Sequence, residues 1–334
     1  MLPTRPLVVV LGASGYIGSA VAAELARRPV QLRLVGRRPC LVPQPGAAAV
    51  EVRTADLAAP GAVARAVADA DIVVHLVAHI AEGVNWRAAE GDQVAERINV
   101  GLAHEVVRAL RASRRLERRP PVLIFAGSAS QVGRPGRIDG SEPDEPVTTY
   151  ARQKLDAERA LKAATAEGVL RGISLRLPTV YGCAPGVEGR GVVTTMATMA
   201  LAGRPLTMWG AGAVERDLVH VTDAARAFAA CLDHVDALAG RHWLVGTGEP
   251  VTVADLFTAI AGSVSGRTGL PPVPVLSVQP PETATAADFR GTVVDSSAFR
   301  AVTGWQPRLS LREALDELVA ALGEPVTEGP ASGR

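Results

Sequence analysis

Residues Leu7–Gly18 read L-V-V-V-L-G-A-S-G-Y-I-G and decide the fold. The five consecutive leucine and valine residues Leu7–Leu11 predict a strand buried on both faces, since a strand with one wet face alternates apolar and polar residues. Three glycines follow at a spacing of three, and an amphipathic run over about 16–28 predicts a helix. The stretch therefore predicts a strand, a tight turn and a helix.

The glycines of this turn predict a dinucleotide site. Glycine lets the backbone turn tightly and lets a pyrophosphate approach the N-terminus of the following helix. An ordinary βα turn is the alternative for an isolated glycine triplet, but this triplet lies directly between strand and helix. The predicted cofactor contacts in the turn and the first helical turn are Gly12, Ser14, Gly15, Tyr16, Ile17 and Gly18.

Beyond this unit, short apolar runs alternate with helical stretches rich in alanine and arginine. The runs predict strands at 31–35, 50–52, 72–77, 122–126 and 173–177. Such alternation is typical of an α/β fold, here a Rossmann-type, doubly wound parallel sheet covered by helices on both faces. We therefore expect parallel strands with crossover helices.

The pattern loosens after about residue 177, where glycine, proline and threonine become frequent. Helices are expected at roughly 191–202, 223–234, 252–265 and 311–322. We expect a dinucleotide-binding domain over residues 1–177 and a smaller C-terminal substrate-binding lobe over 178–323, partly interleaved with the first domain. Residues 324–334, rich in polar residues, proline and glycine, predict a disordered tail.

Charge and cysteine content argue against several classes of binding partner. A formal net charge of +1 gives no global attraction to nucleic acid or to an anionic membrane. Cys40, Cys183 and Cys231 lie far apart without C-x-x-C spacing, which argues against a zinc site and a disulfide framework. The first residues lead into an apolar run too short for a signal-peptide core or a membrane span, so a cytoplasmic location is expected.

The end of the second predicted strand, Val35-Gly36-Arg37-Arg38, predicts the cofactor type. An NAD-binding protein usually presents an acid there to the ribose 2′-hydroxyl, whereas arginine pairs with a 2′-phosphate. Arg37 and Arg38 therefore favour NADP(H), with a solvated strand end as the alternative. Asp56, followed by Leu57, lies where a carboxylate can accept from the adenine amino group; an exposed loop acid is the alternative.

A tyrosine and a lysine lie four residues apart at Tyr150 and Lys154, in a chain with only two lysines and three tyrosines. Residues four apart share one face of a helix. An ammonium beside a phenol favours the phenolate, so we expect a lowered pKa for Tyr150. The pair predicts an acid for proton transfer near neutral pH, with a helix-surface pair as the alternative.

In order and spacing, these motifs resemble an extended short-chain dehydrogenase/reductase of the nucleotide-sugar epimerase/dehydratase group. The resemblance covers nearly everything from Leu7 to Leu322. The matching pieces are Gly12–Gly18, Asp56-Leu57, His75–Ala78, Asn99, Phe125–Gly133, Tyr150–Lys154, Leu175–Gly182, Arg216–Val221 and Gly304–Pro307.

The resemblance implies catalytic roles. Ser128 would hydrogen-bond the reacting carbonyl oxygen, with Ser130 as the nearby rival, and Tyr150 would give that oxygen its proton. Lys154 would hold the nicotinamide ribose, while the cofactor supplies the hydride. A buried helix–strand hydrogen bond is the alternative for Asn99. Four further cofactor contacts are implied at Leu76, Ala78, Asn99 and Pro178.

The substrate lobe resembles the family in two places. Arg216 matches an arginine that contacts the diphosphate, and Trp209 matches an aromatic residue that lies against the base. The alternatives are a salt bridge of Arg216 with Asp217 and a hydrophobic plug at Trp209. Thr179, after Pro178, stands where relatives often have asparagine, and it is included among the expected substrate contacts with Ser128 and Ser130.

The residues after Ser128 select a branch of the family. Dehydratases carry an Asp-Glu pair where this chain has Ala129 and Ser130, and no cysteine is near Ser128 for a fucose-synthase-like double epimerisation. The resemblance then implies NADPH-dependent reduction of the C4 ketone of a nucleotide-linked, dTDP-type 4-keto-6-deoxyhexose, as in natural-product deoxysugars. The alternatives are a nucleotide-sugar 4-epimerase using the same Ser/Tyr/Lys site and a non-catalytic NADP(H)-sensing scaffold.

The resemblance also implies a homodimer. Relatives often pair through the helix that bears the tyrosine and its neighbour, forming a four-helix bundle. The alanine-rich stretches 92–112 and 151–166 are expected to allow that close packing.

Overall fold

The computed structural model describes residues 5–42, 46–80, 91–113, 119–187, 189 and 191–323. The predicted disordered tail, 324–334, lies outside the described residues. No helix within the described ranges is long and apolar enough to span a bilayer.

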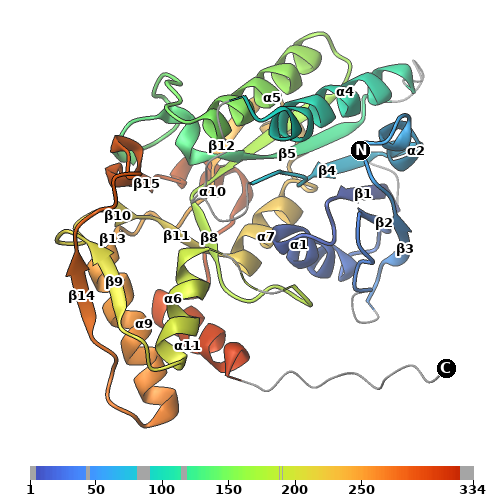
Figure 1. The fold of residues 1–334 in the computed structure, drawn as a ribbon. Coiled ribbons are helices and arrows are strands. Elements are labelled where there is room, and N and C mark those ends of the chain that lie inside the picture. The colour runs from blue at the N-terminus through green and yellow to red at the C-terminus, as the bar shows by residue number, and fades with distance from the viewer. Residues whose placement is uncertain are drawn as a thin grey trace.

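A seven-stranded sheet forms the centre of the molecule (Figure 1). Its strand order is β12-β7-β5-β4-β1-β2-β3, and every neighbouring pair is parallel. The predicted doubly wound parallel sheet is therefore confirmed. In sheet order the strands are β12 (Arg241–Leu244), β7 (Arg171–Leu177), β5 (Val122–Ser128), β4 (Ile72–His75), β1 (Leu7–Leu11), β2 (Gln31–Gly36) and β3 (Ala49–Thr54).

Helices cover both faces because successive side chains of a strand point to opposite sides. On β1, Val8 and Val10 belong to the core beneath α1 (Tyr16–Ala26) and α7 (Val221–Ala230). Val9 and Leu11 belong to the opposite core. That second core is covered by α2 (Ala62–Val67), α4 (Leu102–Ala112) and α5 (Thr149–Ala166).

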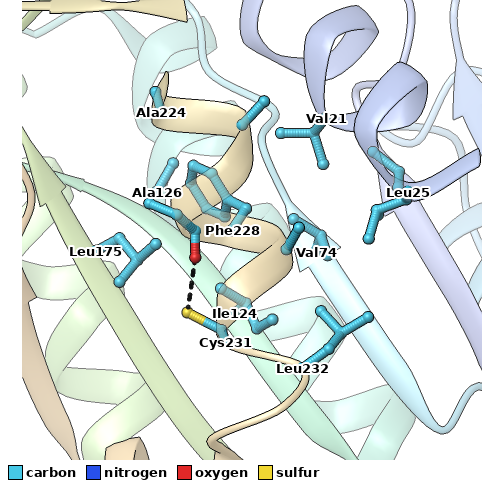
Figure 2. Packing of buried hydrophobic residues seen from close by; sticks show 14 of the residues in the cluster. Val21, Leu25, Val74, Ile124, Ala126, Leu175, Ala224, Phe228, Cys231 and Leu232 are labelled. Carbon is cyan, nitrogen blue, oxygen red and sulfur yellow. Dashed lines mark hydrogen bonds between the residues drawn. The ribbon is translucent and has the colours of Figure 1, made fainter. Parts of the chain in front are cut away.

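Figure 2 shows the first of these cores at close range, with Phe228 of α7 packed among side chains of α1 and the sheet. Phe228 is fully buried, as are Val74 of β4 and Leu175 of β7. Because α7 follows residue 177, this core joins the two halves of the sequence. Strand β12 does the same at the edge of the sheet. The division into 1–177 and 178–323 stays a prediction, with these two elements crossing it.

The lobe has its own apolar core, formed by α6 (Val192–Leu201), α9 (Val253–Thr268) and α11 (Leu311–Leu322), which gather on the side away from α4 and α5 (Figure 1). Three small sheets complete it. They pair β9 (Leu206–Trp209) with β14 (Val275–Val278), β8 (Thr179–Tyr181) with β11 (Leu218–His220), and join β13 (Val251–Thr252), β10 (Glu215–Arg216), β15 (Thr292–Val294) and β6 (Gly136–Ile138).

The short helices are α3 (Gln93–Glu96), α8 (Val235–Leu238), α10 (Ser297–Thr303), a π-helical turn at Arg97–Gly101 and 3₁₀ turns at Ala129–Val132 and Ala286–Phe289. Several boundaries differ from prediction, among them those of β4 and α7. Strand β4 ends at His75, two residues early, where the chain passes the glycine turn. Helix α7 ends at Ala230, and α8 begins separately after it.

Candidate active site

The glycine turn lies between β1 and α1, at the point where the strand order reverses from β1 to β4, the usual ligand crevice of such sheets. Gly12 has a φ of +88°, and a Cβ there would lie 3.1 Å from the backbone of Leu76. A Cβ on Gly18 would lie 2.0 Å from the Gly12 carbonyl oxygen. Only glycine lets α1 start this close to the turn, so the cradle suits a pyrophosphate.

The other predicted contacts of this turn have defined positions. Gly15 is the N-cap of α1 and donates to the Gly12 oxygen at 2.9 Å. The Tyr16 hydroxyl donates to the carbonyl oxygen of Gly182 at 2.8 Å, so it ties the turn to the segment after β8. Ser14 and Ile17 are half-buried in the same turn. Burial raises the pKa of Tyr16.

Arg37 and Arg38 are both exposed at the end of β2. The Arg38 guanidinium donates to the Ser14 carbonyl oxygen at 3.3 Å, which brings it beside the glycine turn. A Cβ on Gly36 would lie 2.3 Å from the Ser14 hydroxyl oxygen and 2.9 Å from its Cβ, so a side chain at that position would require Ser14 to move. The positive charges therefore lie next to the predicted dinucleotide cradle.

Asp56 and Leu57 behave differently. Asp56 is exposed, and its carboxylate accepts from the Ala58 amide at 3.0 Å in a local turn. Leu57 is buried with Val35 in the core under α2 and α4. Leu57 therefore packs against the sheet, while the Asp56 carboxylate stays accessible.

Lys154 ties the predicted proton-transfer pair to β5. Its buried ammonium donates to the carbonyl oxygen of Ala126 at 2.9 Å and lies 4.8 Å from the ring centroid of Phe125. The same nitrogen lies 5.7 Å from the ring centroid of Tyr150, one helical turn earlier. Thr148 caps α5 by accepting from the Ala151 amide at 3.1 Å, which fixes where Tyr150 enters the helix.

The expected lowering of the Tyr150 pKa is wrong. Burial raises the pKa of Tyr150 to about 12 and lowers that of Lys154 to about 8. The spacing of Tyr150 and Lys154 reveals the attraction between an ammonium and a phenolate, which lowers the pKa of the phenol. The cost of burying an ionised phenol raises that pKa, depends on tertiary packing, and is the larger of the two effects here. The phenol is consequently protonated at neutral pH, the state in which it donates a proton.

Ser128 and Ser130 lie side by side at the end of β5. Their hydroxyl oxygens are 2.7 Å apart, and the Ser130 amide donates to the Ser128 oxygen at 3.3 Å. Ser128 is half-buried and Ser130 is exposed. Since the two hydroxyls share one hydrogen bond, Ser130 can polarise Ser128 or replace it, and both alternatives stay open.

Asn99 is buried in the π-helical turn, and its amide bonds to protein on every side. It accepts from the His79 amide at 2.7 Å and donates to the His79 carbonyl at 3.0 Å and to Gln153 at 2.8 Å. Both donor hydrogens are thus used, one toward the segment after β4 and one toward α5. Direct contact of Asn99 with a cofactor stays a prediction.

The remaining predicted cofactor contacts follow β4 and β7. Leu76 is half-buried and donates its amide to Leu11 at 2.9 Å, while Ala78 is exposed. Pro178 is half-buried between β7 and β8.

The predicted substrate residues of the lobe form a second group. Arg216 of β10 donates to the carbonyl oxygens of Asp288 and Arg290, in place of the alternative salt bridge with Asp217. The Asp217 carboxylate instead accepts from backbone amides, including Val294 at 3.0 Å. Thr179 is half-buried in β8 and donates its amide to the Asp217 carbonyl oxygen at 3.3 Å.

A family model described as the NAD dependent epimerase/dehydratase family matches residues 8–246, more than half of the chain. This chain belongs to that family. The resemblance to extended short-chain dehydrogenases/reductases is therefore confirmed.

Some relatives are similar to part of this chain, and others are similar over nearly its whole length. A UDP-glucose 4-epimerase of Mycolicibacterium smegmatis is 32% identical over 201 residues, which are 59% of this chain and 61% of the relative, less than two thirds of its length. A dTDP-6-deoxy-L-talose 4-dehydrogenase (NAD(P)(+)) of Kitasatospora kifunensis is 28% identical, covering 94% of this chain and 95% of the relative. The solved structure of MoeE5 in complex with UDP-glucose and NAD is 26% identical, with a TM-score of 0.76 and coverage of 94% and 97%.

One aromatic residue of this epimerase/dehydratase member was not anticipated from its sequence. Phe289 is 47% exposed and its ring centroid lies 6.1 Å from that of Trp209. The two carbonyls bound by Arg216 belong to the residues on either side of it. Only 4% of the residues are aromatic, so each aromatic residue in the lobe could have been considered as a candidate base contact from the sequence. The exposure of Phe289, however, is visible only in the structure.

Proposed function

We propose that this family member reduces the C4 ketone of a dTDP-linked 4-keto-6-deoxyhexose with NADPH. The observation that carries the proposal is the bond from Lys154 to the Ala126 carbonyl, which fixes α5, the helix that bears the protonated Tyr150, against β5, the strand that ends at Ser128. A neutral phenol is the acid that ketone reduction needs. The full-length relative named as a dTDP-6-deoxy-L-talose 4-dehydrogenase supports the sugar class and the position of the reacting carbon.

NADPH, when bound, supplies a hydride to the C4 carbon. The protein's own residues handle the developing charge on oxygen. Tyr150 gives its phenolic proton to that oxygen, and the hydroxyl of Ser128 or Ser130 donates a hydrogen bond to it. Lys154 stays cationic below its pKa of about 8, and its charge stabilises the tyrosinate that is left.

The choice of NADPH is supported by Arg37 and Arg38. A guanidinium forms charge-assisted hydrogen bonds with a 2′-phosphate, and Arg38 is already held beside the glycine turn by the Ser14 carbonyl. Gly36 stands where an acid would select the 2′-hydroxyl, and a side chain there would have to displace Ser14. MoeE5, by contrast, was solved in complex with NAD. Comparing kcat/KM for NADPH and NADH decides between the two cofactors.

Turnover tests the proposal. Purified protein mixed with NADPH and dTDP-4-keto-6-deoxyglucose should consume the reduced nicotinamide absorbance, with NMR identifying the product. Absence of turnover across a panel of nucleotide-linked 4-keto sugars would remove the proposal.

A nucleotide-sugar 4-epimerase is the second candidate, favoured by the 32% identity to a UDP-glucose 4-epimerase. It would use the same Ser128, Tyr150 and Lys154. Sugar conversion without net consumption of cofactor would identify it. A non-catalytic NADP(H)-sensing scaffold would bind cofactor and turn over no sugar.

We also propose a homodimer through α4 and α5. On α5, Ala151, Ala157 and Ala164 are buried, whereas Ala163 and Ala166 are exposed on the same side as Arg152 and Asp156, so the expected alanine contact stays a prediction. Opposite charges on one helix face suit pairing with a second copy related by a two-fold axis. Light scattering should give twice the chain mass; a monomer at assay concentration would end this proposal.

A further inference from the structure

A buried guanidinium lies beneath the candidate active site. Arg176 of β7 is completely buried, and its two terminal nitrogens bind the carboxylate of Asp144 at 2.6 and 2.9 Å. On its other side it binds Glu158 of α5, with contacts of 2.7 and 3.0 Å. One cation is thus shared by two carboxylates that belong to different segments.

Glu158 accepts two further hydrogen bonds and forms a second ion pair. The fully buried carboxylate also accepts from Ser174 at 2.7 Å and from Gln131 at 3.0 Å, and pairs with Lys162 at 2.7 Å. Burial alone would raise the pKa of Glu158, but the charges and hydrogen bonds of Arg176 and Lys162 lower it to about 2. The carboxylate therefore stays charged over the working pH range, and the cluster is a fixed anchor.

Gln131 connects this anchor to the candidate serine. Its side-chain nitrogen donates to Glu158, and its side-chain oxygen accepts from the Ser128 amide at 2.8 Å. Gln131 is fully buried. A Cβ on Gly127 would lie 2.9 Å from both the Gln131 and the Ser174 side-chain oxygens, so glycine leaves the space that these side chains fill.

The other carboxylate belongs to the chain segment that precedes the tyrosine. Asp144 lies in the segment that leads into α5, a few residues before the cap Thr148 and Tyr150. Arg176 therefore holds both chain segments that carry the proposed catalytic hydroxyls: one through Asp144, the other through Glu158 and Gln131.

We propose that Gln131 is a positioning residue. It bonds both to Glu158, which is paired with the buried Arg176, and to the backbone amide of Ser128. In this way it sets the position of the Ser128 hydroxyl relative to Tyr150. The catalytic consequence rests on the proposed function; the placement of Ser128 does not. Buried polar groups that are fully satisfied give one rigid arrangement, and a hydroxyl displaced by about 1 Å loses up to about 100-fold in rate.

Gln131→Met tests the proposal, because methionine keeps the length and bulk of the side chain while removing both hydrogen bonds. Replacing Arg176 or Glu158 would leave an unpaired buried charge and risk unfolding. Ser174→Ala is the matched control, since Ser174 binds the same Glu158 oxygen as Gln131 and is equally buried. Its hydroxyl donates to Glu158 rather than to Ser128, and it lies on the neighbouring strand.

Two measurements test whether Gln131 positions Ser128. Hydrogen exchange of the Ser128 amide, followed in the cofactor-loaded protein, should accelerate at least about tenfold in Gln131→Met and stay within about twofold of the parent in Ser174→Ala. With a 4-keto sugar that is turned over, kcat should fall about 10- to 100-fold in Gln131→Met, with KM changed less than about twofold.

The proposal fails if Gln131→Met keeps the exchange rate and kcat of the parent, or if Ser174→Ala reproduces its losses. Should the parent turn over no 4-keto sugar, the proposed function fails, and the exchange measurement alone still decides whether Gln131 positions Ser128.

Discussion

The Lys154 ammonium donates to the carbonyl oxygen of Ala126 across 2.9 Å, two residues before Ser128 on the same strand. The Ala126 side chain packs in the core beneath α1 and α7, whereas α5 covers the opposite face of the sheet. The bond therefore reaches the backbone of β5 and fixes α5 beside the end of the strand that carries Ser128. It also leaves the ammonium buried beside Phe125, and this burial lowers its pKa to about 8.

Removing the Tyr150 hydroxyl should separate chemistry from binding. Tyr150→Phe keeps the ring against its neighbours and deletes the proton donor, so kcat should fall about 100- to 10,000-fold, the usual contribution of a general acid. NADPH affinity, measured by fluorescence titration, should stay within about twofold. A variant that retains more than a tenth of the parent kcat would contradict the assignment of Tyr150.

Lys154→Met should stabilise the protein while it removes activity. Burial of the ammonium lowers its pKa from 10.5 to about 8, so the charge opposes folding at neutral pH. Methionine fills similar space without charge, and the free energy of unfolding at pH 7 should rise by on the order of 1 to 3 kcal/mol.

The pH dependence of this gain has a definite sign. Between pH 8 and 10.5 the unfolded chain binds the Lys154 proton and the folded protein does not, so the stability of the parent rises with pH. The advantage of Lys154→Met should then be largest below pH 8 and shrink toward pH 10. Urea unfolding at pH 7 and pH 10 measures it; an advantage that grows with pH would refute burial of the ammonium as its cause.

Much of this arrangement is local in sequence and could be predicted. The strand, glycine turn and helix of Leu7–Gly18 form as expected, since the apolar run and the glycine spacing act between neighbours. The Tyr150 pKa could not be predicted, because burial by distant segments decides it. The same holds for the contacts of Gln131 with Glu158, which join residues of different elements.

Arg37 and Arg38 should determine cofactor preference. Each guanidinium that binds a 2′-phosphate contributes about 1.5 to 3 kcal/mol, so Arg37→Ser and Arg38→Ser should each raise the KM for NADPH by at least about tenfold. The KM for NADH should change little. Arg27→Ser is the control, since its side chain is 76% exposed at the other end of α1. Equal effects on NADPH and NADH would assign the arginines a structural role.

The aromatic pair in the lobe should bind the base of the nucleotide. Phe289 is held between the two residues whose carbonyls Arg216 binds, and the Arg290 guanidinium donates to the Gly133 carbonyl oxygen at 2.6 Å, just after the Ser128 turn. Stacking of a base on an aromatic ring contributes about 1 to 3 kcal/mol.

Phe289→Ala should therefore weaken binding of dTDP about 5- to 150-fold, with kcat at saturating sugar changed far less, because the base is remote from the reacting carbon. Quenching of tryptophan fluorescence by dTDP, with calorimetry as a check, measures the affinity without any turnover. Leu270→Ala is the matched truncation, since Leu270 is 66% exposed on the same lobe, beyond α9. If both variants bind dTDP as the parent does, Phe289 does not contact the base, and Trp209→Ala would then test whether the second ring of the pair stacks alone.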